Sequence, residues 1–246
     1  SQTGYYFRPG TGSGADSWVL HLEEGGWCYN PTDCLARLRT RKGSNNGRLA
    51  TMRLRSLMSG HPEENPDFHN WNVAFFLYCD GSSFTGDRPD AIVVDGTPLH
   101  FRGHANLVAI TSDLLQHRGL SSARQVIVTG CSAGGLSTFF HVDWFREQLP
   151  RSAVLRGMSD AGFFVDTPIR SNATRFSHRR DMASMCLLHH CGAHLHPKCL
   201  AAYSNDEHWK CLFPQYFLHL VDTPLFVINS IVDSWQVVFA FDLGTT

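Results

Sequence analysis

Short apolar runs alternate with longer amphipathic segments along the chain. Such runs, bounded by polar or turn residues, are typical of strands buried in a parallel sheet. They occupy residues 18–22, 73–78, 125–129, 154–158 and 225–229. Helical spacing of apolar residues occurs at Leu107, Ile110, Leu114 and Leu115, and again at Leu136, Phe139, Phe140 and Phe145. The order strand, helix, strand, helix predicts an α/β fold, with a mainly parallel sheet and helices on both faces.

One segment lacks this alternation of strands and helices. Residues 171–211 are rich in His and Cys, and we interpret them as an insertion beside or over the edge of the sheet. No internal repeat or low-complexity linker divides the chain, so residues 1–246 are expected to form one α/β domain. A length of 246 residues is ample for a sizeable core.

The composition narrows the class of protein. Apolar residues make up 43% of the chain and charged residues 17%, which excludes a disordered chain. The formal net charge of -1 gives no reason to expect nucleic acid or an anionic membrane as a partner. No apolar run reaches the roughly 18 residues that a membrane-spanning helix needs.

The strongest chemical signal lies between the predicted strand at 125–129 and the helical pattern that follows it. Residues 130–135 read Gly-Cys-Ser-Ala-Gly-Gly, which fits the G-x-S-x-G nucleophile elbow. In such an elbow a strand turns sharply into a helix, and small neighbours let the backbones approach closely. Ser132 then presents its hydroxyl at a helix N-terminus, where amides favour developing negative charge. We therefore predict that Ser132 is a nucleophile; the alternative is an ordinary glycine-rich turn.

Two further segments fit the same chemistry. Glu23-Glu24-Gly25-Gly26-Trp27-Cys28 directly follows the first predicted strand, and its glycines allow a backbone amide to point into a cleft. An oxyanion hole needs such a donor besides the amide of the residue after the nucleophile, which is Ala133. Asp233 follows the last predicted strand, where this fold class carries the acid of a catalytic triad. Read alone, the first segment is a simple turn, and Asp233 is a helix cap or turn residue.

Together these residues resemble the pectin acetylesterase family of plants, which also includes the animal carboxylesterase Notum. The shared motifs run in family order from near residue 5 to about residue 237, and this set is specific to the family. They are 18–23 (WVLHLE), 25–28 (GGWC), 65–68 (NPDF), 70–72 (NWN), 78–81 (YCDG), 83–87 (SFTGD), 99–103 (LHFRG), 130–135 (GCSAGG), 159–164 (SDAGFF), 213–216 (FPQY) and 233–236 (DSWQ).

The resemblance implies an α/β-hydrolase-like fold, secretion to the extracellular space or cell wall, and catalysis by Ser, Asp and His without a metal or organic cofactor. By motif, Ser132 resembles the nucleophile and Asp233 the triad acid, while Gly26, Trp27 and Ala133 resemble the oxyanion-hole positions. In the implied reaction Ser132 attacks an acetyl ester of cell-wall pectin, an acetyl-serine forms, and water releases acetate. The partner is then acetylated pectin polysaccharide, and we expect a monomer.

Two positions depart from the family pattern. Glu24 stands where plant members have the first glycine of Gly-Gly-Gly-Trp, and its charge either alters the mouth of the cleft or faces water. The larger departure comes after Asp233, because no histidine lies among the residues that follow it. We therefore expect a domain that is incomplete at both ends, with the C-terminal part of the fold missing and the triad histidine outside this chain. Loss of a triad member typically costs several powers of ten in rate.

Three functions stay open at this point. The first is removal of acetyl groups from pectin. The second is a non-catalytic or vestigial polysaccharide-binding homologue, which the missing histidine suggests, since a serine without a base is a poor nucleophile. The third is deacylation of lipidated proteins, as in the animal branch, although the motifs at 79–81 and 99–103 resemble the plant members.

The chain has eight cysteines. Cys28 and Cys34 flank a short loop where the family has a cysteine pair, so we expect a disulfide between them. The stretch from Cys186 to Cys211 holds four cysteines and several histidines, which are ligand types that suit zinc. Because the family places disulfides in this region and uses no metal, we expect disulfides, with zinc and free thiols as alternatives. Cys79 and Cys131 are each expected as a buried thiol or a bridge partner.

Overall fold

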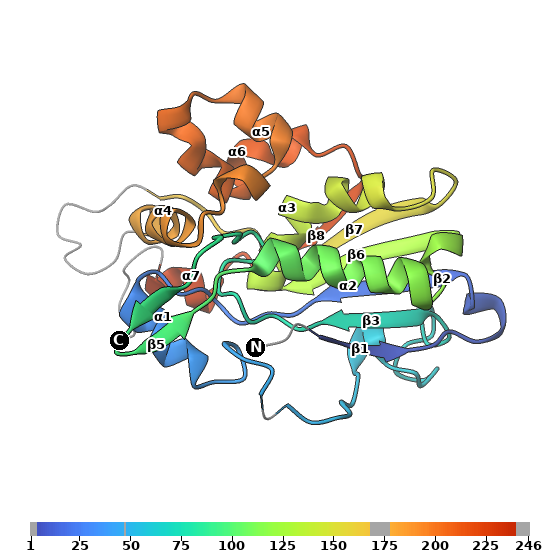
Figure 1. Ribbon diagram of the computed structural model, residues 1–246. Coiled ribbons are helices and arrows are strands. Elements are labelled where there is room, and N and C mark those ends of the chain that lie inside the picture. The colour runs from blue at the N-terminus through green and yellow to red at the C-terminus, as the bar shows by residue number, and fades with distance from the viewer. Residues whose placement is uncertain (1–3, 47, 168–177, 240–246) are drawn as a thin grey trace.

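A six-stranded sheet forms the centre of the molecule (Figure 1). The computed structural model describes residues 4–46, 48–167 and 178–239. The strands lie in the order β1-β3-β2-β6-β7-β8; β1 is antiparallel to β3, and the other neighbours are parallel. Their bounds are β1 (Tyr5–Arg8), β2 (Ser17–Leu22), β3 (Asn72–Phe76), β6 (Gln125–Cys131), β7 (Val154–Asp160) and β8 (Leu225–Ile228). A separate hairpin consists of β4 (Ile92–Val94) and β5 (Thr97–Leu99).

The five strands predicted from apolar runs are β2, β3, β6, β7 and β8, so the prediction of a mainly parallel α/β sheet is confirmed. The apolar pattern predicts neither β1 nor the β4–β5 hairpin. Strand β1 is a half-buried edge strand, and it lacks the continuous apolar run of a strand covered on both faces. The hairpin strands have three residues each, which is too short for a periodic signal.

The helices follow local sequence signals. Their bounds are α1 (Pro31–Leu38), α2 (Gly103–His117), α3 (Ala133–Gln148), α4 (His178–His189), α5 (Pro197–Ala202), α6 (Pro214–Phe217) and α7 (Ser234–Phe239). Helix α1 begins where Asn30 Oδ1 accepts a hydrogen bond from the Asp33 amide at 2.9 Å, with proline at the first helical position. Helices α2 and α3 coincide with the two predicted amphipathic segments. No described helix is both long and apolar enough to cross a membrane.

The two long helices share one face of the sheet. Trp18, Leu20 and Leu22 alternate along β2 and lie in one buried cluster with Phe76 of β3. The same cluster holds the apolar side chains of both α2 and α3, and Phe145 of α3 meets Phe76 edge to face at 6.1 Å. Helices α2 and α3 therefore lie together on this face of the sheet. The physical reason is that strand order, which the pattern does not encode, decides the side on which each right-handed crossover passes.

The predicted His- and Cys-rich insertion lies between β7 and β8. Its residues 171–177 fall outside the described residues, and the rest consists of short helices. Its helices from α5 onward pack over α3: Phe217 stacks on Phe140 at 5.8 Å, and His196 Nε2 lies 3.1 Å from Asp143. Its first helix, α4, lies beside the loop that leaves the sheet after β2, where His189 Nε2 is 3.1 Å from the Cys28 carbonyl. Figure 1 shows α5 and α6 as a layer beyond α3.

Candidate active site

The segments predicted to carry the nucleophile, the oxyanion hole and the triad acid all leave the sheet at one edge. Strands β2, β6, β7 and β8 are parallel, so the loops that follow them leave from the same carboxyl-terminal edge. Leu22 at the end of β2 pairs with Gly130, two residues before Ser132. Asp233 follows β8, which lies two strands away from β6.

Ser132 occupies the sharp turn between β6 and α3. Its backbone has φ 54° and ψ -121°, a conformation that is costly for a residue with a side chain. The turn is fixed from both sides, because the Ser132 amide donates to the Asp160 carbonyl and its own carbonyl accepts from the Leu136 amide, each at 2.9 Å. Ser132 is half-buried. This is the backbone geometry that the G-x-S-x-G pattern predicts.

Close backbone packing around the turn explains its small residues. A Cβ atom on Gly134 would lie 2.0 Å from the Leu22 carbonyl oxygen, and one on Gly130 would lie 2.3 Å from the Gly134 carbonyl oxygen. Both neighbours are backbone atoms of a buried strand and helix, so they cannot move aside. Ala133 is the first residue of α3, and its amide is one of the four that a helix leaves without an internal acceptor.

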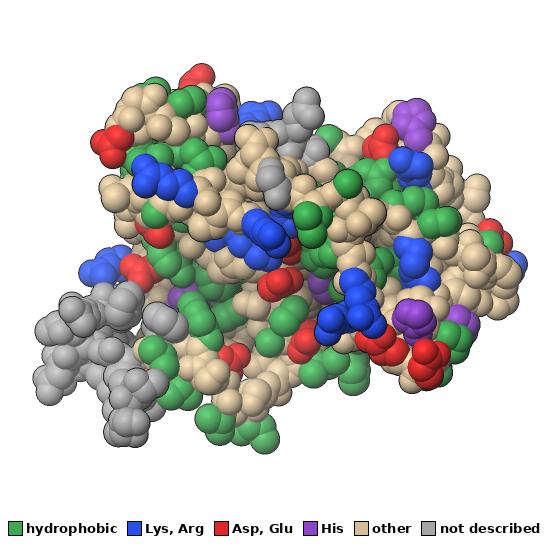
Figure 2. All heavy atoms as spheres, turned by 90° about the horizontal axis from the view of Figure 1, so that it is seen from below, with side chains coloured by type: hydrophobic (Ala, Val, Ile, Leu, Met, Phe, Trp, Pro, Cys, Tyr) green, Lys and Arg blue, Asp and Glu red, His purple; other side chains and the backbone are tan. Residues whose placement is uncertain are grey.

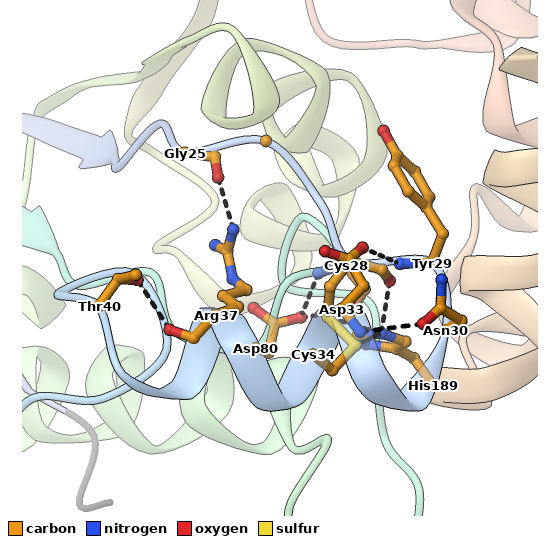
Figure 3. Close-up of a disulfide and its surroundings, with 12 residues drawn as sticks. Gly25, Cys28, Tyr29, Asn30, Asp33, Cys34, Arg37, Thr40, Asp80 and His189 are labelled. Carbon is orange, nitrogen blue, oxygen red and sulfur yellow. Dashed lines mark hydrogen bonds between the residues drawn. A yellow bond between two sulfur atoms is a disulfide. The ribbon is translucent and has the colours of Figure 1, made fainter. Parts of the chain in front are cut away.

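The Gly-Gly-Trp loop after β2 is held by its carbonyl groups. Arg37 Nη1 donates a hydrogen bond to the Gly25 carbonyl at 2.6 Å (Figure 3). Tyr78 Oη donates one to the Gly26 carbonyl at 2.8 Å. In a trans peptide the carbonyl and the following amide point in opposite directions. The two hydrogen bonds therefore turn the amides of Gly26 and Trp27 away from Arg37 and Tyr78. Gly26 has φ +60°, which a side chain would strain.

Ser83 connects this loop to the start of α3. Trp27 Nε1 donates to Ser83 Oγ at 2.8 Å, and Ser83 Oγ donates to the Ala133 carbonyl at 2.9 Å. The Ser83 amide donates to Tyr78 Oη at 2.9 Å, so the same residue also orients the tyrosine. All of these groups are buried. The chain of hydrogen bonds fixes the Gly-Gly-Trp loop relative to the elbow.

The buried carboxylate of Glu23 anchors the start of this loop. Glu23 is 5% exposed and accepts two hydrogen bonds from Arg48, at 2.9 and 2.8 Å, and one from Lys42 at 2.9 Å. It also accepts the Tyr78 amide at 2.7 Å. The neighbouring Glu24, which departs from the family pattern, has a half-exposed side chain that pairs with Lys42 at 3.2 Å.

Sequence reasoning missed the roles of Arg37, Tyr78 and Ser83. Tyr78 and Ser83 fall within family motifs, but a motif alone does not show that they contact the Gly-Gly-Trp loop. Their separation from that loop exceeds 50 positions, so only the folded chain brings them together.

Asp233 lies in the loop between β8 and α7 and is half-buried. Its Oδ1 accepts a hydrogen bond from the Gln236 amide at 3.0 Å, so the carboxylate caps the start of α7. The loop borders a cavity of about 420 Å³ lined on its other side by Phe163 and Val165. The position of Asp233 therefore fits both interpretations of the sequence, a helix cap and an acid at the carboxyl-terminal edge of the sheet.

No described histidine makes a hydrogen bond to Ser132 or Asp233 in the structure. His178 at the start of α4 is near the site: its ring centroid lies 6.0 Å from that of Trp27 and 5.3 Å from that of Trp235. Burial lowers the pKa of His178 to about 4, so its ring is neutral at ordinary pH. The base expected from the family pattern is thus not supplied by the described histidines in this arrangement.

Aromatic side chains join the loop after β2 to the loop after β8. Trp27 meets Phe164 edge to face at 4.8 Å and Trp235 at 5.8 Å. Phe164 and Phe84 are 2% and 1% exposed, so both are core residues in this structure. The Trp27 ring is thus part of the packing that positions its own backbone.

The expected disulfide between Cys28 and Cys34 is confirmed, with the two Cα atoms 5.1 Å apart (Figure 3). It ties the end of the Gly-Gly-Trp loop to α1. The His- and Cys-rich stretch contains two further disulfides, Cys186–Cys191 and Cys199–Cys211.

The disulfides remove the thiolate ligands that the zinc alternative needs. His189 Nε2 lies 3.6 Å from Cys28 Sγ and 3.7 Å from Cys34 Sγ, but both sulfurs are oxidised. Cys79 and Cys131 lie outside the three disulfides, and burial raises the pKa of Cys131 to about 11. The thiol of Cys131, beside the elbow, is therefore a poor nucleophile at neutral pH.

A parallel sheet with a strained serine between strand and helix, beside a glycine loop at the same edge, defines an α/β-hydrolase-like protein. The sequence matches the family model described as Pectinacetylesterase over residues 1–244, and the chain belongs to this family.

Individual relatives agree with the family assignment. Pectin acetylesterase 5 of Arabidopsis thaliana is 42% identical over 238 residues, which cover 96% of this chain and 54% of that protein. Pectin acetylesterase 4 of the same plant is 40% identical, covering 96% and 56%. The solved structure of the Wnt deacylase Notum from Drosophila matches with a TM-score of 0.87 and 26% identity, covering 100% of this chain and 71% of that one. The chain thus spans about half the length of the curated relatives it matches.

Proposed function

We propose that this chain carries the nucleophile and oxyanion-hole part of a serine carboxylic-ester hydrolase that removes acetyl groups from pectin. The observation that carries the proposal is the strained Ser132 turn, tied through Ser83 to the Gly-Gly-Trp loop. Relatives at about 40% identity are named pectin acetylesterases, whereas those named palmitoleoyl-protein carboxylesterases are 26–28% identical. This difference favours the acetyl ester over a lipid ester.

In the proposed reaction, Ser132 Oγ attacks the ester carbonyl and loses its proton to a base. The carbonyl oxygen becomes an oxyanion, which accepts hydrogen bonds from the amides of Gly26, Trp27 and Ala133. The bond to the sugar oxygen then breaks, and that oxygen takes the proton from the base. Water attacks the acetyl-serine in the same way and releases acetate. Asp233 orients the base, which is an imidazole in enzymes of this type.

Acetate release from acetylated pectin tests this proposal. The Ser132→Ala variant is expected to lose at least a thousandfold in rate, as single deletions of a triad nucleophile do. Ser152→Ala, an exposed serine in the loop between α3 and β7, serves as the matched control and keeps full activity. Undiminished acetate release by Ser132→Ala refutes the nucleophile assignment.

A second candidate function is non-catalytic binding of the polysaccharide. It is favoured by one observation, that no described histidine is hydrogen-bonded to Ser132 or Asp233. Binding of pectin fragments without turnover of a simple acetyl ester supports this alternative, and rapid hydrolysis excludes it.

We further propose that the protein acts outside the cell, in the cell wall, as a monomer. Three disulfides support an oxidising compartment, because cytosolic thiols are normally kept reduced. The family and its named relatives support a polysaccharide substrate.

A further inference from the structure

The segment after Cys34 concentrates positive charge. Residues 35–62 contain seven of the 21 Lys and Arg residues of the chain and no Asp or Glu. The whole chain has a net charge of -1, so this segment differs strongly from its surroundings. A run of one charge sign on a folded protein creates a local potential that attracts ligands of the opposite sign.

Part of this charge is neutralised inside the protein. Lys42 and Arg48 bind the carboxylate of Glu23, and Lys42 also reaches Glu24. Arg37 is half-buried, and its guanidinium lies 4.9 Å from the centre of the Tyr78 ring.

Four arginines of the segment are exposed: Arg39, Arg41, Arg53 and Arg55. In the described part of the chain, none of the four forms an ion pair with an acidic side chain. Figure 2 views the molecule from the side on which the loop after α1 lies in Figure 1, and Lys and Arg side chains are interspersed with Asp and Glu on this face. Arg53 interacts electrostatically with the nearby Glu64 carboxylate, and the exposed guanidinium groups also face solvent, where an external anion can reach them. We call these four residues the arginine track.

The arginine track begins beside the candidate oxyanion loop. Lys42, next to Arg41, packs on Gly25: a Cβ atom on Gly25 would lie 2.7 Å from Lys42 Cδ. Lys42 Nζ also donates to the Glu24 carbonyl at 2.6 Å. A ligand held by this end of the track therefore lies on the outer side of the loop that borders Ser132.

The other end of the track borders a cleft with a volume of about 880 Å³. One wall is formed by residues 50–54, which include Arg53, and the other by strand β1 with Tyr5, Tyr6 and Phe7. Arg8, Arg118 and Asp113 also line this cleft, and the Tyr5 hydroxyl donates a hydrogen bond to Asp113. Tyr6 Oη donates to the Leu49 carbonyl at 2.6 Å and so fixes the loop against the strand.

This combination of groups suits a sugar acid. Guanidinium groups bind carboxylates through paired, charge-assisted hydrogen bonds. Aromatic rings pack on the apolar faces of sugar rings and bury apolar surface on both sides. A galacturonate polymer carries one carboxyl group on each sugar, so an extended chain meets several arginines in turn. A nucleic acid is less suited, because the protein has no overall positive charge.

We propose that the arginine track and the adjoining cleft form a binding surface for the free carboxylates of an anionic polysaccharide, polygalacturonate. The inference rests on the proposed function and adds to it a preference: acetylated regions with free carboxylates bind, and methyl-esterified regions do not. The class of reaction that supplies such a substrate is hydrolysis of galacturonate methyl esters, in which water gives methanol and a free carboxylate.

Binding of polygalacturonate to the Ser132→Ala variant, measured by calorimetry at 50 and 300 mM salt, tests the surface. We expect binding that weakens with salt, as contacts between charges do. Replacing all four track residues with Gln in the same variant is expected to weaken binding at least tenfold. Arg151→Gln, an exposed arginine in the α3–β7 loop, is the matched control and leaves binding unchanged. Circular dichroism verifies that the fourfold variant is folded.

Three outcomes overturn the proposal. They are equal binding by the fourfold variant, equal binding of fully methyl-esterified polymer, and equal affinity for double-stranded DNA, which would indicate a general polyanion surface. Turnover of a small neutral acetyl ester by the protein with Ser132 intact tests the proposed function separately. If that turnover is absent while salt-sensitive polygalacturonate binding persists, the hydrolase proposal fails and the arginine track stands. In an active enzyme, the fourfold variant is expected to raise KM on acetylated polygalacturonate.

Discussion

The hydroxyl of Tyr78 donates a hydrogen bond to the carbonyl of Gly26, at 2.8 Å, inside the protein. Because the Gly26–Trp27 peptide is planar and trans, this contact also sets the direction of the Trp27 amide. A residue 52 positions away along the chain thus orients one of the proposed oxyanion donors. The Arg37 contact with Gly25 does the same for the Gly26 amide.

Tyr78→Phe is expected to weaken both the fold and the site. It leaves the Gly26 carbonyl and the Ser83 amide without their partner, which costs about 2 kcal/mol of unfolding free energy. In an active enzyme, kcat falls at least tenfold while KM changes little, since the amides act on the transition state. Tyr6→Phe, which removes one exposed hydrogen bond to Leu49, is the control: it should leave kcat unchanged and lower the unfolding free energy less than Tyr78→Phe does. An unchanged kcat for Tyr78→Phe argues against positioning of the loop by this hydroxyl.

Gly134→Ala is expected to prevent folding or to lower the unfolding free energy by more than about 3 kcal/mol. The added methyl would lie 2.0 Å from the Leu22 carbonyl oxygen, in the middle of the sheet. Gly192→Ala is the matched substitution, because nothing lies within 4 Å of its Cβ position, and it should be nearly neutral. Urea unfolding of the two variants makes the comparison. Equal stability of both variants would mean that Gly134 does not pack closely against the Leu22 carbonyl.

Ser132→Gly is expected to stabilise the protein while removing the proposed nucleophile. Glycine relieves the strain of the φ 54°, ψ -121° conformation, and this gain exceeds the entropic cost of glycine in the unfolded chain. The net gain is about 1 kcal/mol, which thermal unfolding detects as a higher Tm. Ser152→Gly, an exposed loop residue without positive φ, should lose a few tenths of a kcal/mol instead. A lower Tm for Ser132→Gly would show that the turn is not strained.

Stability is expected to fall as the pH drops below about 6.5, the ordinary pKa of histidine. Burial lowers the pKa of His178 to about 4, so below pH 6.5 the unfolded chain binds a proton that the folded protein does not. This favours unfolding by about 2 kcal/mol at pH 5, and the stabilisation is fully present again above pH 6.5. His178→Phe should reduce the difference in unfolding free energy between pH 7 and pH 5 by about that amount. The exposed His61→Gln should leave the difference unchanged.

Removing the Cys28–Cys34 disulfide by replacing both residues with Ser is expected to lower the unfolding free energy by about 2 kcal/mol. The value follows from the loop-closure entropy of a short loop, with the cysteines six positions apart. Denaturant unfolding under non-reducing conditions measures the loss. Cys79→Ser, at a cysteine outside the three disulfides, should cost less. A variant as stable as the parent would indicate that the folded protein strains this disulfide.

Much of the site could be predicted from local sequence. The Gly-Cys-Ser-Ala-Gly-Gly segment specifies a strand-to-helix turn because the close approach of Gly134 to Leu22 admits no side chain. The Cys28–Cys34 disulfide was likewise predictable, because the two cysteines are near neighbours in the chain and at a position where the family has a pair. The partners of Glu23, at Lys42 and Arg48, were not predictable, since many nearby cations have the same charge and only the fold selects two of them.

The sequence by itself determined the five parallel strands, the two long helices, the serine turn and the run of positive charge, because each depends on residues close together in the chain. Tertiary structure alone decided that α2 and α3 share one face and that Tyr78, Ser83 and Arg37 hold the Gly-Gly-Trp loop. The physical reason is that strand order and long-range hydrogen bonds join groups whose separation along the chain carries no local signal. Apolar periodicity reports which side chains are buried, and not which neighbours they meet.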